Sequence, residues 1–193
     1  MKLYAIPSPQ MTKQDIQSFL AELIVNHQLH KNSQSYDGLI LIFCGHGEDE
    51  NMLVASDGKQ ISITQLRSSF DCSAMESLKD LPKIFIIDAC RGETAPKAYE
   101  LTTRSRDIQW GHNDDGFLII WSTTKGHKVA DLSLLSKSFK DVVTSKYKSG
   151  YPFKQMLQDI RTDIRNKKCS EWYCIESQDT TDYDIIFQQR KSL

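Results

Sequence analysis

Two stretches of the chain decide the fold: residues 39–47, LILIFCGHG, and residues 84–92, IFIIDACRG. Each is a short apolar run that ends in polar or reactive side chains. Runs of this length, rich in Ile and Phe, are typical of strands buried on both faces of a parallel sheet. The carboxyl ends of parallel strands meet at one edge, where open α/β sheets hold their active sites. The sequence therefore predicts that His46 and Cys90 lie at that edge.

The two motifs carry the chemistry of a nucleophile and its base, a cysteine beside a histidine. Cys90 directly follows its strand, at a position where a helix N-terminus or nearby cations can favour the thiolate. Gly45 and Gly47 allow the backbone to approach a substrate closely, and the N–H of Gly47 could help to bind an oxyanion. The alternatives are a structural Cys90 that packs as a small hydrophobe and a His46 that serves only a loop or the core. The pairing of the motifs favours catalysis.

Length and composition bound the class of protein. With 193 residues, the chain is long enough for one compact domain. Its 24 Lys and Arg and 25 Asp and Glu give a formal net charge of −1, which offers no argument for nucleic acid or a membrane surface as a partner. No apolar run approaches the ~20 residues that span a bilayer, and the N-terminal apolar stretch is too short for a signal peptide.

The cysteines point to a reducing compartment. There are five, an odd and widely spaced set, and no secretory signal accompanies them. This pattern predicts free thiols and a cytoplasmic protein. The absence of a CxxC pair argues against zinc, so we predict no metal site, although a site formed by Cys44, His46 and Cys90 is conceivable. The acidic segments 48–50 and 113–115 could bind Ca²⁺, but such loops commonly just face solvent.

The remaining pattern predicts alternating strands and helices. Thr12 caps a helix with Asp15 three residues on, and Pro152 opens another in its first turn. Residues 93–115 are polar and irregular, which indicates a functional or flexible segment. The order is that of a three-layer α/β domain. The further elements are predicted strands at 3–6, 117–121 and 183–187, a hairpin at 52–62, and helices at 64–70 and 136–147.

Both motifs resemble those of a known family of cysteine peptidases. Residues 88–92, DACRG, are close to the caspase motif Gln-Ala-Cys-Arg-Gly, and residues 43–47, FCGHG, are closer to the Ser-Gly-His-Gly of metacaspases and paracaspases. The spacing of His46 and Cys90 is near the roughly 50 residues found in caspases. Residues 117–126 also resemble the strand and turn that open the caspase small subunit. From residue 3 to residue 187 the chain thus resembles the caspase-like cysteine peptidases, which implies a mostly parallel central sheet with helices on both faces.

The resemblance implies a role for each motif residue. Cys90 would be the nucleophile and His46 the general base and acid, and the N–H groups of Gly47 and Cys90 would form the oxyanion hole. The chain would be a single peptidase domain, with a large-subunit-like part at 1–92, a linker at 93–115 and a small-subunit-like part at 116–193. Cleavage of the linker would activate a zymogen, and a strand at 184–187 could serve a homodimer. Candidate cleavage positions are Arg104, Arg106, Asp107, Asp114 and Asp115.

Departures from the caspase pattern bear on specificity. Asp88 stands where caspases carry Gln, and Asp131 aligns near a caspase Arg that helps to bind a P1 aspartate. Two carboxylates in the S1 pocket would repel an aspartate and attract Arg or Lys, which predicts cleavage of protein or peptide substrates after basic residues. Alternatively, Asp131 is solvated and Asp88 bonds to nearby backbone, while Lys125 and Lys128 bind an acidic P1 residue.

A last departure concerns the N-terminus. Family members begin with a strand and a helix ahead of the segment that matches residues 3–6, and this sequence lacks them. The chain is then a fragment or a shortened homologue, and apolar surface on the sheet would be exposed. The rival function is a catalytically silent caspase fold that acts as a regulatory or binding module. A redox role for Cys90 lacks a visible resolving cysteine.

Overall fold

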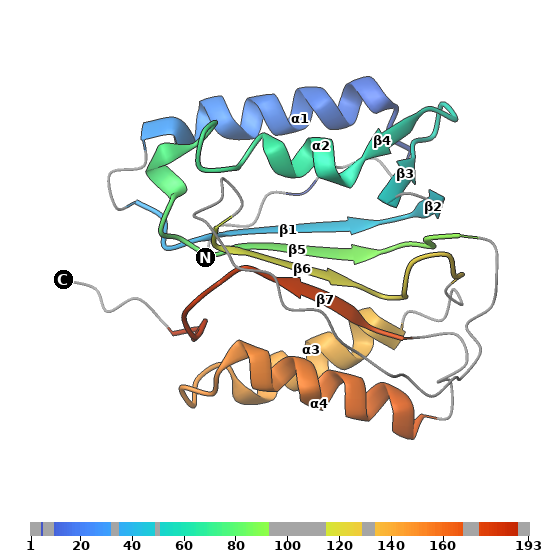
Figure 1. The fold of residues 1–193 in the computed structure, drawn as a ribbon, viewed down its shortest axis with the longest axis vertical. Helices are drawn as coiled ribbons and strands as arrows, with labels where there is room; N and C mark the ends of the chain where they lie inside the picture. Colours follow the sequence, from blue (N-terminus) through green and yellow to red (C-terminus); the bar gives the residue numbers. More distant parts are fainter. Residues whose placement is uncertain are drawn as a thin grey trace, which may run out of the picture.

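The structure is a computed structural model, and it describes residues 5, 10–31, 35–48, 51–92, 115–128, 134–167 and 174–188. Its centre is a four-stranded sheet in the order β1-β5-β6-β7 (Figure 1). The first three strands are parallel and the fourth is antiparallel. The sheet is therefore mostly parallel, as predicted. Its strands are β1 (Leu39–Cys44), β5 (Lys83–Asp88), β6 (Phe117–Trp121) and β7 (Glu176–Asp179).

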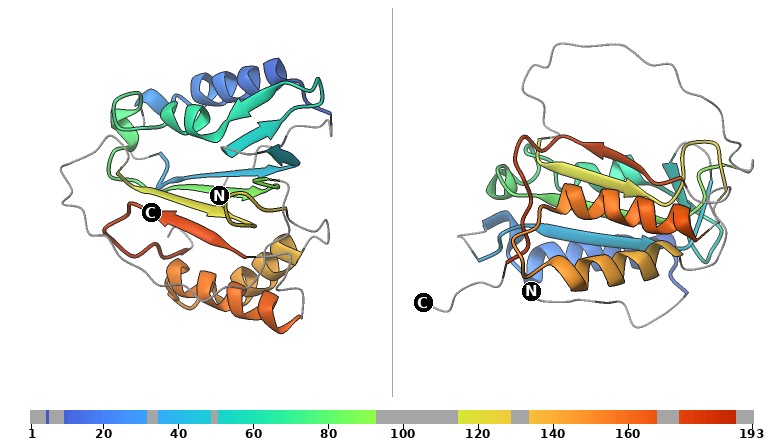
Figure 2. Two further views of the ribbon diagram at one scale, coloured as in Figure 1. Left: turned by 45° about the vertical axis from the view of Figure 1, so that its right-hand side comes forward. Right: turned by 90° about the horizontal axis from the view of Figure 1, so that it is seen from below.

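Helices cover both faces of this sheet (Figures 1 and 2). On one face lie α1 (Lys13–Asn26) and α2 (Ile63–Ser68), and on the other lie α3 (Leu134–Lys146) and α4 (Phe153–Asn166). Each face of the sheet packs against its helices to form a hydrophobic core. Successive residues of β5 contribute to opposite cores, since Phe85 packs on the α1–α2 side and Ile86 on the α3–α4 side. The predicted three-layer arrangement is confirmed. Two short 3-10 helices, η1 (Leu29–Lys31) and η3 (Glu76–Leu78), complete the α1–α2 layer.

The helix starts follow local side-chain chemistry. Thr12 and Asp15 form the predicted capping box, with the Asp15 N–H donating to Thr12 Oγ1 at 3.2 Å and the Thr12 N–H donating to Asp15 Oδ2 at 2.9 Å. The short helix α2 differs from the prediction because its N-cap is Ser62, not Thr64. The Ser62 hydroxyl accepts from the Gln65 N–H, which starts the helix two residues earlier.

A second, three-stranded sheet carries the histidine. Its strands are β2 (His46–Glu48), β3 (Met52–Val54) and β4 (Gln60–Ser62), all antiparallel. The hairpin predicted at 52–62 is confirmed, and the sheet extends further than predicted, since His46 pairs with Val54. The base candidate thus begins a strand rather than lying in a loop.

The prediction that both decisive strands are buried on two faces is wrong for β1. Ile40 is 42% and Ile42 is 62% exposed, although their partners in β5, Ile84 and Ile86, are buried. In the described part of the chain β1 lies at the end of the sheet, so the layer that covers Ile84 and Ile86 does not extend over it. In the described part of the chain, the outer face of β1 is therefore apolar and exposed.

The strand predicted at 183–187 is also wrong. This segment makes a single bridge, between Pro152 and Ile186, and serves instead as a brace for α4. The Phe153 N–H at the start of α4 donates to the Ile185 carbonyl at 2.7 Å, and the Phe153 and Phe187 rings lie 4.9 Å apart. The more polar β7 takes the edge of the sheet, where its outward residues can face solvent.

Several predictions fall outside the described residues. These are the strand at 3–6, nearly all of the linker at 93–115 with its cleavage positions other than Asp115, Asp131, and most of the two acidic segments.

Candidate active site

The segments that carry His46 and Cys90 lie next to each other at the carboxyl edge of the parallel strands. The two strands run in register, so that the end of β1 at Cys44 pairs with the end of β5 at Asp88. Just beyond these ends, Gly47 packs on the Cys90 main chain so closely that a Cβ at Gly47 would collide with the Cys90 carbonyl oxygen. This position therefore requires glycine, and the contact sets the segment that bears His46 against the residue that bears the thiol.

Hydrogen bonds and accessibility agree with this placement. The Gly45 N–H donates to the Asp88 carbonyl at 3.2 Å, which fixes the residue before His46 to the strand that carries Cys90. His46 is exposed and Cys90 is half-buried, so a peptide can reach both side chains. Cys90 forms no disulfide within the described residues.

The segment after Cys90 is locked to the turn that follows β6. The Arg91 N–H donates to the His127 carbonyl at 2.8 Å, and the Gly126 N–H donates to the Arg91 carbonyl at 2.7 Å. A Cβ at Gly92 would collide with the Gly126 main chain, so the two segments pass each other with no side chain between them. The main chain on both sides of Cys90 is therefore fixed by neighbouring strands and turns.

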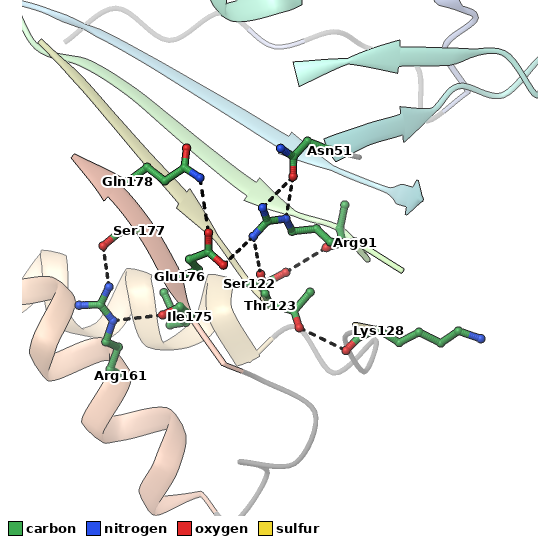
Figure 3. A network of polar contacts seen from close by, with 11 residues as sticks. Asn51, Arg91, Ser122, Thr123, Lys128, Arg161, Ile175, Glu176, Ser177 and Gln178 are labelled. Carbon is green, nitrogen blue, oxygen red and sulfur yellow. Dashed lines mark hydrogen bonds and ion pairs between the residues drawn. The ribbon is translucent and has the colours of Figure 1, made fainter. Parts of the chain in front are cut away.

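The side chain of Arg91 lies at the centre of a buried polar network (Figure 3). It is 1% exposed, and its Nε and Nη2 donate to Asn51 Oδ1 at 2.9 and 2.7 Å. Its Nη1 forms an ion pair with Glu176 at 3.0 Å and donates to the Thr123 carbonyl at 3.3 Å. The guanidinium carbon lies 4.2 Å from the centre of the Trp121 ring. Burial lowers the pKa of the Arg91 guanidinium, and the Glu176 carboxylate opposes that shift.

The proposed S1 pocket is described in part. Asp88 is half-buried at the end of β5. Burial and the nearby Asp88 carboxylate raise the pKa of the Cys44 thiol, which indicates negative charge beside the end of β1. Asp131, the second predicted S1 acid, lies outside the described residues. Lys125 and Lys128 are exposed in the turn after β6, and the Lys128 side chain points away from the network in Figure 3.

Two residues of this network, Asn51 and Glu176, were not predicted from the sequence. Asn51 lies between β2 and β3, and Glu176 begins β7, so neither is close in sequence to Arg91. The sequence feature that could have indicated such a network was Arg91 itself. Arg91 follows a buried strand and Cys90. A buried arginine needs hydrogen-bond acceptors, but the sequence does not say which segments supply them.

Two further observations concern other classes of site. Among the described residues, no three His, Cys, Asp or Glu side chains gather in a group that could hold a metal ion. No helix in the described part of the chain has the length and apolar character needed to cross a membrane.

Comparison with known proteins shows what the fold and site belong to. A family model described as the caspase domain matches residues 4–184. Curated relatives include caspase-8 of Rattus norvegicus, 38% identical over 81 residues, and caspase-8 of Mus musculus, 41% identical over 68 residues. These matches cover 42% and 35% of this chain, and 16% and 13% of the two relatives, so the chain spans a small part of their length.

The fold itself matches a solved caspase. The crystal structure of caspase-1 from Spodoptera frugiperda superposes with a TM-score of 0.72 at 17% identity, covering 91% of this chain and 73% of that one. This likeness bears on the fold alone. Because the family model spans nearly the whole sequence, the chain belongs to the caspase domain family. The prediction of a caspase-like cysteine peptidase domain is thereby confirmed at the level of the family.

Proposed function

We propose that this chain is a cysteine endopeptidase that works through Cys90 and His46. The observation that supports the proposal is the close approach of Gly47 to the Cys90 carbonyl, because it brings the residue after His46 against the main chain of Cys90 at the carboxyl edge of the sheet. The family's name as a peptidase domain supports the same function. The accessible His46 and Cys90 side chains agree with a substrate as large as a peptide.

The proposed reaction has two steps. In the first, His46 takes the thiol proton, Cys90 Sγ attacks the scissile carbonyl carbon, and the resulting oxyanion accepts hydrogen bonds from the N–H groups of Gly47 and Cys90. His46 then gives its proton to the leaving amine, and a thioester remains. In the second step, His46 takes a proton from water, which attacks the thioester and releases the acid. The Cys90 sulfur leaves as the thiolate and regains its proton from His46.

For specificity, we propose an S1 pocket that selects Arg or Lys. The support is the half-buried Asp88 carboxylate at the end of β5, two residues before the nucleophile. Asp131 is the proposed second acid, from its place in the sequence. The competing proposal is a caspase-type preference for aspartate, which the exposed Lys125 and Lys128 after β6 would serve.

The regulatory proposals follow the family pattern. The chain would be a single domain at 1–193, in which residues 93–115 form a linker. Cleavage of this linker would convert an inactive zymogen into the active enzyme, and the enzyme would work in the cytoplasm. No cofactor is proposed for catalysis, and Ca²⁺ enters as a variable of the test below. A homodimer through the C-terminal strand would use β7 (Glu176–Asp179), which takes the sheet edge in place of 184–187. Sedimentation at several protein concentrations tests the dimer.

The decisive experiment compares fluorogenic peptides that differ only in P1, as Arg, Lys, Asp or Ala, with and without Ca²⁺. We expect cleavage after Arg and Lys that disappears in Cys90→Ala and falls about 10²–10⁴-fold in His46→Ala. Asp88→Asn should lower kcat/KM for the Arg peptide about tenfold or more while changing the slow cleavage of the Ala peptide little, because only the cationic side chain uses the carboxylate.

The other outcomes separate the alternatives. Cleavage after Asp, also lost in Cys90→Ala, would keep the peptidase and overturn the proposed pocket. A chain that unfolds cooperatively on heating but cleaves none of the peptides would favour the silent regulatory or binding module. Activity that survives in Cys90→Ala would contradict the proposed nucleophile.

A further inference from the structure

Asn51 connects the strand that bears the histidine to the residue after the nucleophile. It is the last residue before β3, and β2, the strand that pairs with β3, begins at His46. Its side-chain oxygen accepts two hydrogen bonds from the Arg91 guanidinium, at 2.9 and 2.7 Å (Figure 3). Bonds with a charged donor are the stronger kind, and two bonds from one planar group also fix direction.

The backbone at Asn51 matches this role. Its φ is +61°, in the left-handed region that few side chains adopt readily, and asparagine tolerates it well. The residue at this turn must therefore accept an uncommon backbone conformation and also reach Arg91. Few side chains meet both requirements, and asparagine is one of them.

Arg91 is held on its other sides by elements that do not carry the dyad. Glu176 comes from β7 and Thr123 from the turn after β6, and Trp121 provides the ring beneath the guanidinium. A buried arginine with these partners has little freedom, so what it binds is held at a fixed place relative to the adjacent Cys90. The Gly47 contact is steric and prevents the hairpin from moving closer, whereas the Asn51 bonds prevent it from moving away.

We infer that Asn51 is a positioning residue, which through Arg91 fixes the hairpin of β2 and β3 so that His46 stays within reach of Cys90. The inference rests on the Cys90–His46 dyad proposed above. Asn51 touches no reacting atom in this scheme. Its effect is on the fraction of time in which the two catalytic side chains are correctly placed, and a displacement of about 1 Å can lower a rate about 100-fold.

The test uses variants that separate the side chain from the backbone. Asn51→Gly removes the acceptor and keeps the left-handed conformation accessible. Asn51→Asp keeps an acceptor for both arginine nitrogens and also tolerates that conformation. Glu176→Gln is the matched control, because it alters the charge of the same network and leaves the Arg91–Asn51 bonds in place. His46→Ala provides the reference for loss of the base.

The main readout is the rate of Cys90 alkylation by iodoacetamide as a function of pH, followed by mass spectrometry of the Cys90 peptide. It reports whether His46, the base of the proposed dyad, affects the reactivity of the thiol, and it needs no knowledge of the substrate. We expect His46→Ala to move the midpoint of the profile to higher pH, Asn51→Gly to move it in the same direction, and Asn51→Asp and Glu176→Gln to stay near the wild type. Asn51→Gly should also lower kcat about tenfold or more, with KM changed less than about twofold.

The other outcomes would contradict either the positioning role of Asn51 or the dyad. If His46→Ala shifts the alkylation profile and Asn51→Gly does not, the positioning role is wrong, even if Asn51→Gly lowers the melting temperature. If Glu176→Gln shifts it as far as Asn51→Gly, the effect comes from general loosening of the network, and the role assigned to Asn51 is also wrong. If His46→Ala changes neither the alkylation profile nor peptide cleavage, the proposed dyad itself fails.

Discussion

β1 and β5 are neighbouring six-residue strands, LILIFC and KIFIID, and each leads into one half of the candidate dyad. Their sequences predict the same environment, but the structure gives them different ones. Five of the six residues of β5 are buried, whereas Leu41 alone is buried in β1. The paired residues Ile42 and Ile86 illustrate the contrast, at 62% and 6% exposed.

The two strands therefore differ in how they are held, since β5 is buried on both faces and β1 on one. β5 is central, lies between two parallel neighbours and contributes to both cores, so Cys90 follows the strand of the sheet that is buried on both faces. β1 packs on one face, through Leu39, Leu41 and Phe43, and presents its other face outward in the described part of the chain. The histidine thus lies beyond a less buried strand, so its placement depends more on the Gly47 and Asn51 contacts.

The largest expected effect is a loss of stability in β5. Ile86→Ala should lower the free energy of unfolding by about 2–5 kcal/mol, because it removes apolar atoms from a closed core and leaves a cavity. Urea denaturation followed by circular dichroism measures the change.

Ile42→Ala is the matched control, with the same substitution on the same face of the paired strand. We expect the free energy of unfolding to fall by less than about 1 kcal/mol, since the Ile42 side chain is already exposed to solvent. A loss as large as that of Ile86→Ala would mean that the outer face of β1 is covered in solution, and the contrast between the strands would fail.

A smaller effect is expected from the helix that covers the inner face of β1. Thr12→Ala removes the N-cap of α1, whose Leu20 packs in the same core as Leu41. The free energy of unfolding should fall by about 1 kcal/mol, because the Asp15 N–H loses its acceptor. Urea denaturation of Thr12→Ser, which keeps the hydroxyl, should match the wild type, and equal losses in both variants would contradict the capping role.

The smallest effect at neutral pH concerns Tyr183, which packs against the core on the α3–α4 side of β5. Within the described structure its buried hydroxyl finds no hydrogen-bond partner, and burial raises its pKa to about 12. Tyr183→Phe should therefore change the stability by less than about 0.5 kcal/mol at pH 7, or increase it slightly.

The pH dependence of Tyr183→Phe has a definite sign. Between the ordinary value near pH 10 and about pH 12, the folded state keeps a proton that the unfolded state has lost, so this group reduces stability as the pH rises. Between pH 9 and 11.5, the melting temperature should fall less steeply with pH in Tyr183→Phe than in the wild type. If the two plots of melting temperature against pH are parallel, the Tyr183 hydroxyl is solvated.

Much of the fold, and the strands that lead to the two candidate residues, could be predicted from local sequence. The apolar runs located β1, β5 and β6, and the capping residues at Thr12 located the start of α1. The common edge at which the strands before His46 and Cys90 end followed as well, since parallel strands in register end at one edge whatever lies around them. The strand predicted at 183–187 failed because an apolar segment that braces a helix has the same composition as one that joins a sheet.

The sequence by itself determined the two motifs, the strands that carry them and the α/β class, because apolar runs and turn residues act over a few neighbours along the chain. The tertiary structure alone decided which face of β1 is exposed and which partners Arg91 finds. Burial depends on what lies above a side chain, and Asn51 and Glu176 reach Arg91 from segments 40 and 85 residues away in the sequence. Such partners are chosen by packing, which no local pattern records.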